Sequence, residues 1–223
     1  KLPILTKDDV RKHFNDLIAR NSQVFNPRVA HTSGSTGEPL TYYIDRHLSI
    51  MISACVWRHW RWCGIEPRNL IAVFRGTLID DFGKKQVNYW ILNGNQLHFS
   101  TFQMNEEVMT KYVQVLKKWR PVLIRGYPSS LEILAQFIIE QGFDVPSPKA
   151  IHTSSETVSL SQRELIETAF NAPLFDWYSH GESTVNAGEC DRHEGLHLGL
   201  EFGLTEFVKT LETENMDNIY NVV

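Results

Sequence analysis

Leu70-Ile71-Ala72-Val73-Phe74 is a run of five apolar residues without a polar break. A strand with one solvent-facing side alternates apolar and polar residues, whereas an unbroken run is typical of a strand buried on both faces of a parallel sheet. Further strands are predicted at 96–99, 122–124, 150–152 and 173–175. Helical spacing of apolar residues predicts helices over 46–63, 106–119, 129–141 and from 161 onward. Strands that alternate with helices predict an α/β fold, a layered and largely parallel sheet flanked by helices.

Several helix starts carry the spacing of a capping box, in which a Ser or Thr is followed three residues later by an acidic residue. Each such pair predicts that the hydroxyl accepts a hydrogen bond from the first turn of the helix. The pairs are Thr6 with Asp9, Ser129 with Glu132 and Ser161 with Glu164, and the first predicts a helix to about residue 20.

The end of the chain departs from the α/β alternation. From Gly195 on, strand-like runs at 196–198, 204–208 and 219–223 follow one another without helices, which predicts an antiparallel part. We therefore expect an α/β region over 1–194 and the start of a β-rich subregion over 195–223. Because the chain starts at Lys1 and stops on an apolar run, we expect it to be a piece of a longer protein.

The composition is that of a globular protein, with 42% hydrophobic and 22% charged residues among 223 and a formal net charge of −4. This charge gives no general attraction to nucleic acid or to an anionic membrane. No apolar run approaches the ~20 residues of a membrane span, and no signal peptide stands at the amino end. Three scattered cysteines argue against a disulfide framework, so a reducing compartment, the cytoplasm, is expected.

Between predicted strands at 29–31 and 40–44 stands a polar loop, His31-Thr32-Ser33-Gly34-Ser35-Thr36-Gly37-Glu38-Pro39-Leu40. Gly34 and Gly37 remove side chains where a ligand approaches, and backbone N–H groups with hydroxyl donors suit an anion. No lysine follows either glycine, so the loop is not a Walker A motif. The alternative is an ordinary polar turn.

Two more polar loops follow predicted strands, at 153–157 and 178–183. Ligands of open parallel sheets bind at the carboxyl ends of strands, so the three loops are predicted to converge. Together they would suit a nucleotide with a divalent cation, with Tyr178 stacking on the base and Glu182 as a hard oxygen ligand for Mg²⁺. The alternative is three unrelated surface turns.

The segment 32–39 resembles the phosphate-binding signature of the adenylate-forming enzymes, the superfamily of acyl-CoA synthetases and aryl-CoA ligases. Tyr178-Ser179-His180-Gly181-Glu182 is similar to that superfamily's Tyr-Gly-x-Thr-Glu motif, and the order of the two motifs agrees. Gly126-Tyr127-Pro128-Ser129-Ser130-Leu131 and Ala187-Gly188-Glu189-Cys190 resemble the branch of phenylacetate–CoA ligase and the CapK-like proteins of polysaccharide gene clusters. The resemblance implies the large nucleotide-binding domain of these enzymes, without their small carboxy-terminal domain.

The resemblance implies a two-step reaction. A carboxylic acid attacks the α-phosphate of ATP to give an acyl adenylate, and a thiol, usually that of coenzyme A, then displaces AMP. ATP, Mg²⁺ and coenzyme A are thus the expected cofactors, and a small carboxylic acid is the expected partner. Whether the chain also forms a homodimer is left open. The implied roles are phosphate binding by Thr32, Ser33, Gly34, Ser35, Thr36 and Gly37, adenine binding by Ser155, Glu156, Thr157 and Tyr178, Mg²⁺ binding by Glu182, and catalysis by Glu182, Thr36 and His180.

Two departures from the motif keep other functions open. Ser179 stands where the family has Gly, and Gly181 stands where it has Thr, so a hydroxyl near the phosphate is missing. A nucleotide- or acyl-binding module without turnover is therefore an alternative, and a scaffold protein that binds no nucleotide is another.

A separate metal site is suggested by the spacing of Cys190, His193 and His197, which is C-x₂-H-x₃-H. Thiolate and imidazole are ligands that zinc accepts. A fourth ligand is not evident, and the alternative is a polar loop whose thiol stands near two imidazoles.

Overall fold

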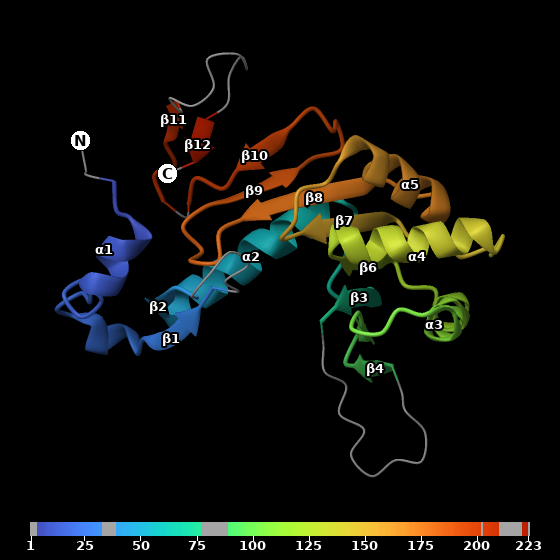
Figure 1. Ribbon diagram of the computed structural model, residues 1–223, viewed down its shortest axis with the longest axis horizontal. Helices are drawn as coiled ribbons and strands as arrows, with labels where there is room; N and C mark the ends of the chain where they lie inside the picture. The colour runs from blue at the N-terminus through green and yellow to red at the C-terminus, as the bar shows by residue number, and fades with distance from the viewer. Residues whose placement is uncertain (1–3, 33–38, 77–88, 202, 210–219, 223) are drawn as a thin grey trace, which may run out of the picture. The chain divides into compact units, whose positions relative to one another are not determined.

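The computed structural model describes residues 4–32, 39–76, 89–201, 203–209 and 220–222. The chain forms two compact units. The first, here the hairpin unit, comprises Lys1–Val56, Ser179–Asn186 and Leu198–Val223, and the second, here the sheet unit, comprises Trp57–Tyr178 and Ala187–His197. Figure 1 labels their elements.

The sheet unit is built on an eight-stranded sheet whose strands lie in the order β10-β9-β8-β7-β6-β3-β5-β4. β8, β7, β6, β3 and β5 are parallel, and β4 runs antiparallel to β5. The predicted layered sheet is confirmed. The strands are β3 (Ile71–Arg75), β4 (Trp90–Asn93), β5 (Gln96–Ser100), β6 (Leu123–Gly126), β7 (Ala150–Ser154), β8 (Leu174–Ser179), β9 (Asn186–Glu189) and β10 (Leu196–Leu198).

One face of the sheet packs on α3 (Glu106–Trp119), α4 (Pro128–Glu140) and α5 (Leu160–Phe170) in a single apolar core. Alternate strand residues face this core, which includes the fully buried Phe74 and Phe99, whose rings stack at 4.5 Å. The buried Tyr112 of α3 packs on both rings and donates its hydroxyl to the carbonyl of Ser100 at 2.7 Å. The apolar run that predicts β3 is therefore buried as expected.

The last turns of α2 (Arg46–Trp62) lie against the other face of the sheet. The imidazole of His59 hydrogen-bonds the Glu189 carbonyl at 2.7 Å and the ring of His152 at 3.2 Å, and all three residues are buried. Gly64, at φ +74°, follows the helix in the left-handed conformation that glycine tolerates best.

In the hairpin unit, β1 (Arg28–His31) and β2 (Thr41–Ile44) form a separate antiparallel pair, with His31 opposite Thr41. The two predicted strands are confirmed, but the first does not belong to the parallel sheet, and residues 33–38 of the predicted turn lie outside the described residues. The other described elements of this unit are α1 (Lys7–Lys12), a 3₁₀ turn η1 (Ser22–Phe25) and the antiparallel pair β11 (Phe207–Lys209) and β12 (Tyr220–Val222).

The helix starts agree with the predictions in part. Thr6 and Asp9 form the predicted capping box, but α1 ends at Lys12 rather than near residue 20. α4 starts at Pro128, after an N-cap residue without a side-chain cap, because proline lacks an N–H and its fixed φ favours the first helical position. The capping box of α5 is formed by Ser159 and Gln162, two residues before the predicted pair.

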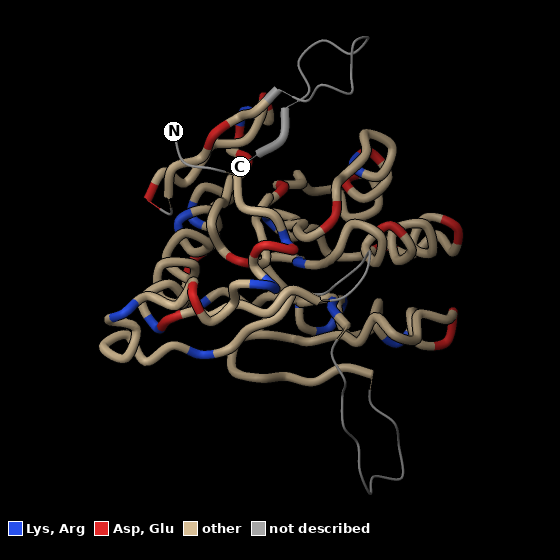
Figure 2. Tube along the Cα trace, turned by 60° about the vertical axis from the view of Figure 1, so that its left-hand side comes forward, with Lys and Arg blue, Asp and Glu red and all other residues tan. Residues whose placement is uncertain are grey.

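Lys and Arg positions are interspersed with Asp and Glu positions along the trace rather than collected in one block (Figure 2). Within the described residues, no helix has both the length and the apolar character needed to cross a membrane.

Candidate functional site

The polar loop between β1 and β2 is closed at its base by Thr32 and Leu40. The Thr32 amide donates to the Leu40 carbonyl at 3.0 Å, and the Leu40 amide donates to the Thr32 hydroxyl oxygen at 2.9 Å. Thr32 is thus held at the loop's entrance. The predicted phosphate-binding residues Ser33, Gly34, Ser35, Thr36 and Gly37 lie outside the described residues.

The loop that follows β8 lies against this entrance. A side chain placed on Gly181 would put its Cβ 3.5 Å from Cγ2 of Thr32, an ordinary contact distance. The Tyr42 hydroxyl donates a hydrogen bond to the Gly181 carbonyl, which ties the loop to β2. Two of the three predicted loops, separated by about 140 residues of sequence, are therefore neighbours at their described residues.

The segment from His180 to Thr184 is a tight turn. The Ser183 amide donates to the His180 carbonyl at 3.0 Å, and Ser183 has a φ of +58°. Nδ1 of His180 and the hydroxyl oxygen of Thr184 are 3.1 Å apart, a contact that orients the imidazole. The turn places Glu182, which is half-buried, on the same side as Tyr42. Desolvation first, and then the Glu182 charge, raise the pKa of the Tyr42 phenol.

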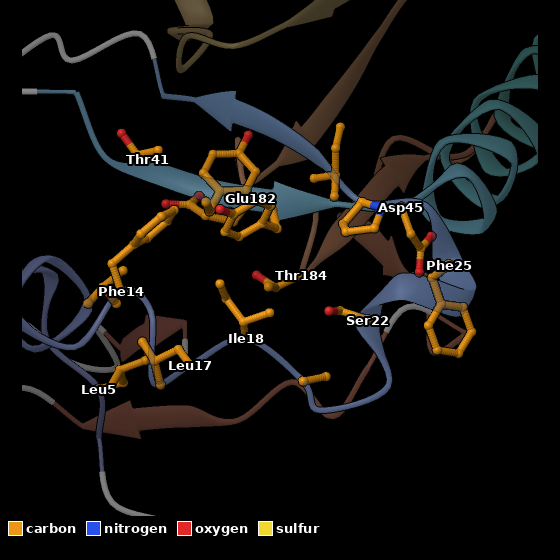
Figure 3. A pocket seen from close by; sticks show the side chains of 16 residues that line it. Leu5, Phe14, Leu17, Ile18, Ser22, Phe25, Thr41, Asp45, Glu182 and Thr184 are labelled. Atoms are coloured by element: carbon orange, nitrogen blue, oxygen red, sulfur yellow. The ribbon is translucent and has the colours of Figure 1, made fainter.

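Glu182 and Tyr42 border a pocket of about 550 Å³ in the hairpin unit. Figure 3 shows Leu17 and Ile18 from the segment after α1 directed into the same space as Glu182 and Thr184. The wall is largely apolar and aromatic, and its polar residues include two with carboxylates, Asp45 and Glu182. Its lining residues are Leu5, Val10, Phe14, Leu17, Ile18, Ala19, Ser22, Phe25, Pro27, Thr41, Tyr42, Tyr43, Ile44, Asp45, Glu182 and Thr184.

Tyr42 and Thr184 are site residues that the sequence-based reasoning missed. Tyr42 fixes the Gly181 carbonyl, and Thr184 contacts His180. A signal for Thr184 was available, because a hydroxyl two residues after a candidate metal ligand falls in the same turn. The sequence held no such signal for Tyr42, apart from its position in the strand that follows the polar loop.

The second loop, after β7, belongs to the sheet unit. Ser154 pairs with Trp177, so the carboxyl ends of β7 and β8 are adjacent, and Tyr178 at the end of β8 is 38% exposed. Ser155 has a φ of +75°, which is unusual for a residue with a side chain. The Glu156 carboxylate accepts hydrogen bonds from the amide and the hydroxyl of Ser129, both at 3.0 Å. Ser129 lies in the first turn of α4, so Glu156 serves this structure as a cap for that helix.

Cys190, His193 and His197 are not assembled into the predicted zinc site. Within the described residues, no group of three or more His, Cys, Asp or Glu side chains is placed to hold a metal ion. The His197 ring packs on Trp62 at 5.6 Å, and the His193 ring packs on Phe175 at 4.8 Å. The two imidazoles thus pack on different aromatic rings instead of sharing a metal site.

Glu189, beside the predicted zinc ligands, also has a structural role. Its buried carboxylate pairs with the Arg163 guanidinium at 2.9 Å and accepts from the Asp176 amide at 2.9 Å. His193 Nδ1 lies 3.4 Å from the same carboxylate.

The matches to known proteins cover most of this chain. No family model matches the sequence. The sequence is 28% identical over 213 residues to protein CapK of Staphylococcus aureus. This match covers 92% of this chain and 46% of CapK. A 2-hydroxyisobutyryl-CoA ligase, solved in an open conformation with 2-HIB-AMP and CoA, matches with a TM-score of 0.61 and 21% identity over 87% of this chain and 47% of that chain. VinN matches with a TM-score of 0.51 and 16% identity, over 79% of this chain and 43% of the VinN chain.

The chain therefore has the fold of the adenylate-forming acyl-CoA ligases and is related in sequence to CapK, which confirms the resemblance expected from its motifs. It spans about half the length of these relatives.

Proposed function

We propose that the protein containing this chain is an AMP-forming acid–thiol ligase. It would activate a small carboxylic acid with ATP and Mg²⁺ to an acyl adenylate and pass the acyl group to the thiol of coenzyme A. The observation that carries the proposal is the contact of Thr32 and Tyr42 with Gly181, because it joins the base of the polar loop to the loop that bears Glu182. These are the two segments to which the sequence resemblance gives the phosphate and the metal.

Glu182 fits the metal role in its chemistry. Its residue is half-buried and lines the pocket, and its carboxylate is a hard oxygen ligand of the kind that Mg²⁺ prefers. When bound, Mg²⁺ neutralises charge on the phosphates. His180, oriented by Thr184, would donate a proton or a hydrogen bond to an anionic group in the same turn.

The remaining proposed roles follow the resemblance. Thr32 and the loop residues 33–37 would donate to the phosphates, Thr36 among them at the reacting phosphate. Tyr178 and the loop residues Ser155 and Thr157 would contact the adenine, and they are exposed, as such contacts require. Glu156 is proposed to support that loop through its bonds with Ser129 rather than to bind the base itself.

The test is calorimetric titration of this chain with ATP and Mg²⁺, carried out on the wild type and on Glu182→Gln. The substitution removes the charge but keeps the shape, so we expect at least tenfold weaker binding of Mg·ATP and little change in binding of ATP without metal. Glu164→Gln is the matched control, because Glu164 is exposed on α5. Equal affinity in Glu182→Gln and the wild type would remove Glu182 from the metal site, and no binding of ATP by the wild type would favour the scaffold function instead.

A binding module without turnover is the second candidate. The observation that favours it is the exposed Gly181, which leaves no hydroxyl at the position beside Thr32. Acid-dependent exchange of pyrophosphate into ATP separates the two, measured on the whole protein that contains this chain. Exchange that requires the acid supports the ligase, and ATP binding without exchange supports the module.

A further inference from the structure

The strand order of the sheet creates a switch point between β3 and β6. β3 pairs in parallel with β5 on one side and with β6 on the other. The chain that leaves β3 goes on to β4 and β5, whereas the chain that leaves β6 goes to β7 in the opposite direction. Connections that diverge in this way leave a crevice at the carboxyl ends of the two strands, and ligands of open α/β sheets bind in such crevices.

Two arginines stand at this switch point. Arg75 is the last residue of β3, and Arg125 is the last but one of β6. Arg125 lies opposite Val73, so Arg75, two residues further along β3, is on the same face of the sheet. Both side chains are partly buried, and the Nε atom of each is buried without a hydrogen-bond partner.

Neither arginine has a carboxylate partner among the residues that the structure describes. Aromatic rings flank them instead: the Arg125 guanidinium carbon is 5.4 Å from the Trp60 ring centroid, and that of Arg75 is 5.9 Å from the Tyr127 centroid. A ring face attracts a cation but accepts none of the in-plane N–H bonds of a guanidinium. Within the described residues, the Nε–H of each arginine therefore has no acceptor.

Among the described residues, the titratable groups that lie opposite the pair on the neighbouring strands are two histidines, which bring no negative charge. His98 lies opposite Val73 on β5, and burial, followed by the charges of Arg75 and Arg125, lowers its pKa. His152 lies opposite Arg125 on β7, where burial and the same charges also lower its pKa. Burial, and then the charge of Arg75, lower the pKa of Arg125 itself to about 10. Both shifts disfavour the charged imidazoles, so the positive charge of this part of the sheet, as far as its residues are described, belongs to the arginines.

We propose that Arg75 and Arg125 form a binding site for an oxyanion, the carboxylate or phosphate group of a small molecule, at the switch point of the sheet. A guanidinium presents two parallel N–H bonds that match either group. The anion would remove the repulsion within the pair and satisfy donors that the fold leaves unused. The proposal needs neither ATP nor a metal and stands apart from the ligase function proposed above.

The experiment is calorimetric titration of the whole chain with inorganic phosphate and, separately, with succinate, at low ionic strength. We expect the wild type to bind at least one of the two and Arg75→Met and Arg125→Met each to weaken that binding tenfold or more. Arg68→Met removes an exposed positive charge from the same unit and is the matched control, with affinity expected within twofold of the wild type. The preferred probe tells whether the group is a phosphate or a carboxylate.

One further variant keeps the outcome decisive. Arg125→Lys keeps the charge but loses the paired donors, so it should fold and bind more weakly than the wild type, even if Arg125→Met fails to fold. The proposal is overturned if the wild type binds neither probe, if Arg68→Met weakens binding as much as Arg75→Met, or if Arg125→Lys binds as tightly as the wild type.

Discussion

At the scale of single residues, Gly188 leaves no room for a side chain against His59. A Cβ built on Gly188 would lie 2.6 Å from Cδ2 of the imidazole. That imidazole is held from both sides, by the Glu189 carbonyl at 2.7 Å and by the His152 ring at 3.2 Å. The absence of a side chain at residue 188 thus allows α2 to place His59 directly on β9.

We expect Gly188→Ala to lower the free energy of unfolding by about 1–3 kcal/mol, because the methyl group must displace a hydrogen-bonded, buried ring. Urea denaturation of the variant measures this loss. His59→Ala is the partner for a double-mutant cycle, because it removes the ring that the methyl group would meet. Gly188→Ala should then cost much less in the His59→Ala background, whereas additive losses would show that the two residues do not conflict.

At the scale of elements, the start of α5 shows how a sequence pattern can locate a helix but miss its cap. The spacing of Ser161 and Glu164 satisfies the capping-box rule, yet the helix starts two residues earlier. Ser159 accepts from the Gln162 amide at 3.1 Å, and the Gln162 side chain accepts from the Ser159 amide at 3.0 Å. Gln162 also donates to Glu132 of α4 at 2.8 Å, a tertiary contact that favours the earlier start.

Ser159→Ala should lower the free energy of unfolding by about 1 kcal/mol, since it leaves the Gln162 amide without its cap. Ser161→Ala removes the same chemical group two residues later. It should cost less, because the hydrogen-bond partner of that hydroxyl among the described residues is the Ser159 hydroxyl oxygen, at 3.0 Å, and not a backbone amide of the helix. Thermal or urea unfolding of both variants provides the comparison. A larger loss for Ser161→Ala would mean that the cap lies where the sequence pattern placed it.

Strands were predictable where their own residues favour extended structure and not where the tertiary environment selects them. The run that ends in Phe74 could be identified because continuous apolar residues suit a strand with two buried faces. β9 could not, because Asn186-Ala187-Gly188-Glu189 has no β-branched or aromatic residue. It is a strand because Glu189 is neutralised by Arg163 and because Gly188 admits His59.

At the scale of the whole molecule, the motifs predicted which loops carry the candidate site. They did not predict the sheet to which the strands beside each loop belong. The polar loop was assigned to the parallel sheet, but β1 and β2 form their own antiparallel pair. A short strand gives no information about its partner, because pairing is a long-range property. The arginine pair was missed too. In both β3 and β6 an arginine follows the apolar residues, but this signal can be recognised only when the two strands are known to be neighbours.

The stability of the chain should fall as the pH is lowered from 7.5 to 5.5, because His59 and His152 are buried in one cluster. Burial is the first cause of the lowered pKa of both imidazoles, whose ordinary value is 6.5. Below that pH the unfolded chain binds protons that the folded chain excludes, so the free energy of unfolding decreases, by up to about 1.4 kcal/mol per histidine per pH unit. Burial of Asp176 raises the pKa of its carboxyl and acts in the opposite direction, towards lower pH.

Urea denaturation at the two pH values measures this dependence. His152→Phe fills the same buried space without a titrating group, so its free energy of unfolding should change less between pH 7.5 and 5.5 than that of the wild type. His47→Gln is the control, because His47 is exposed and its loss should leave the wild-type dependence in place. An equal free energy of unfolding of the wild type at both pH values would contradict the assignment, since a buried imidazole that resists protonation must destabilise the fold in acid.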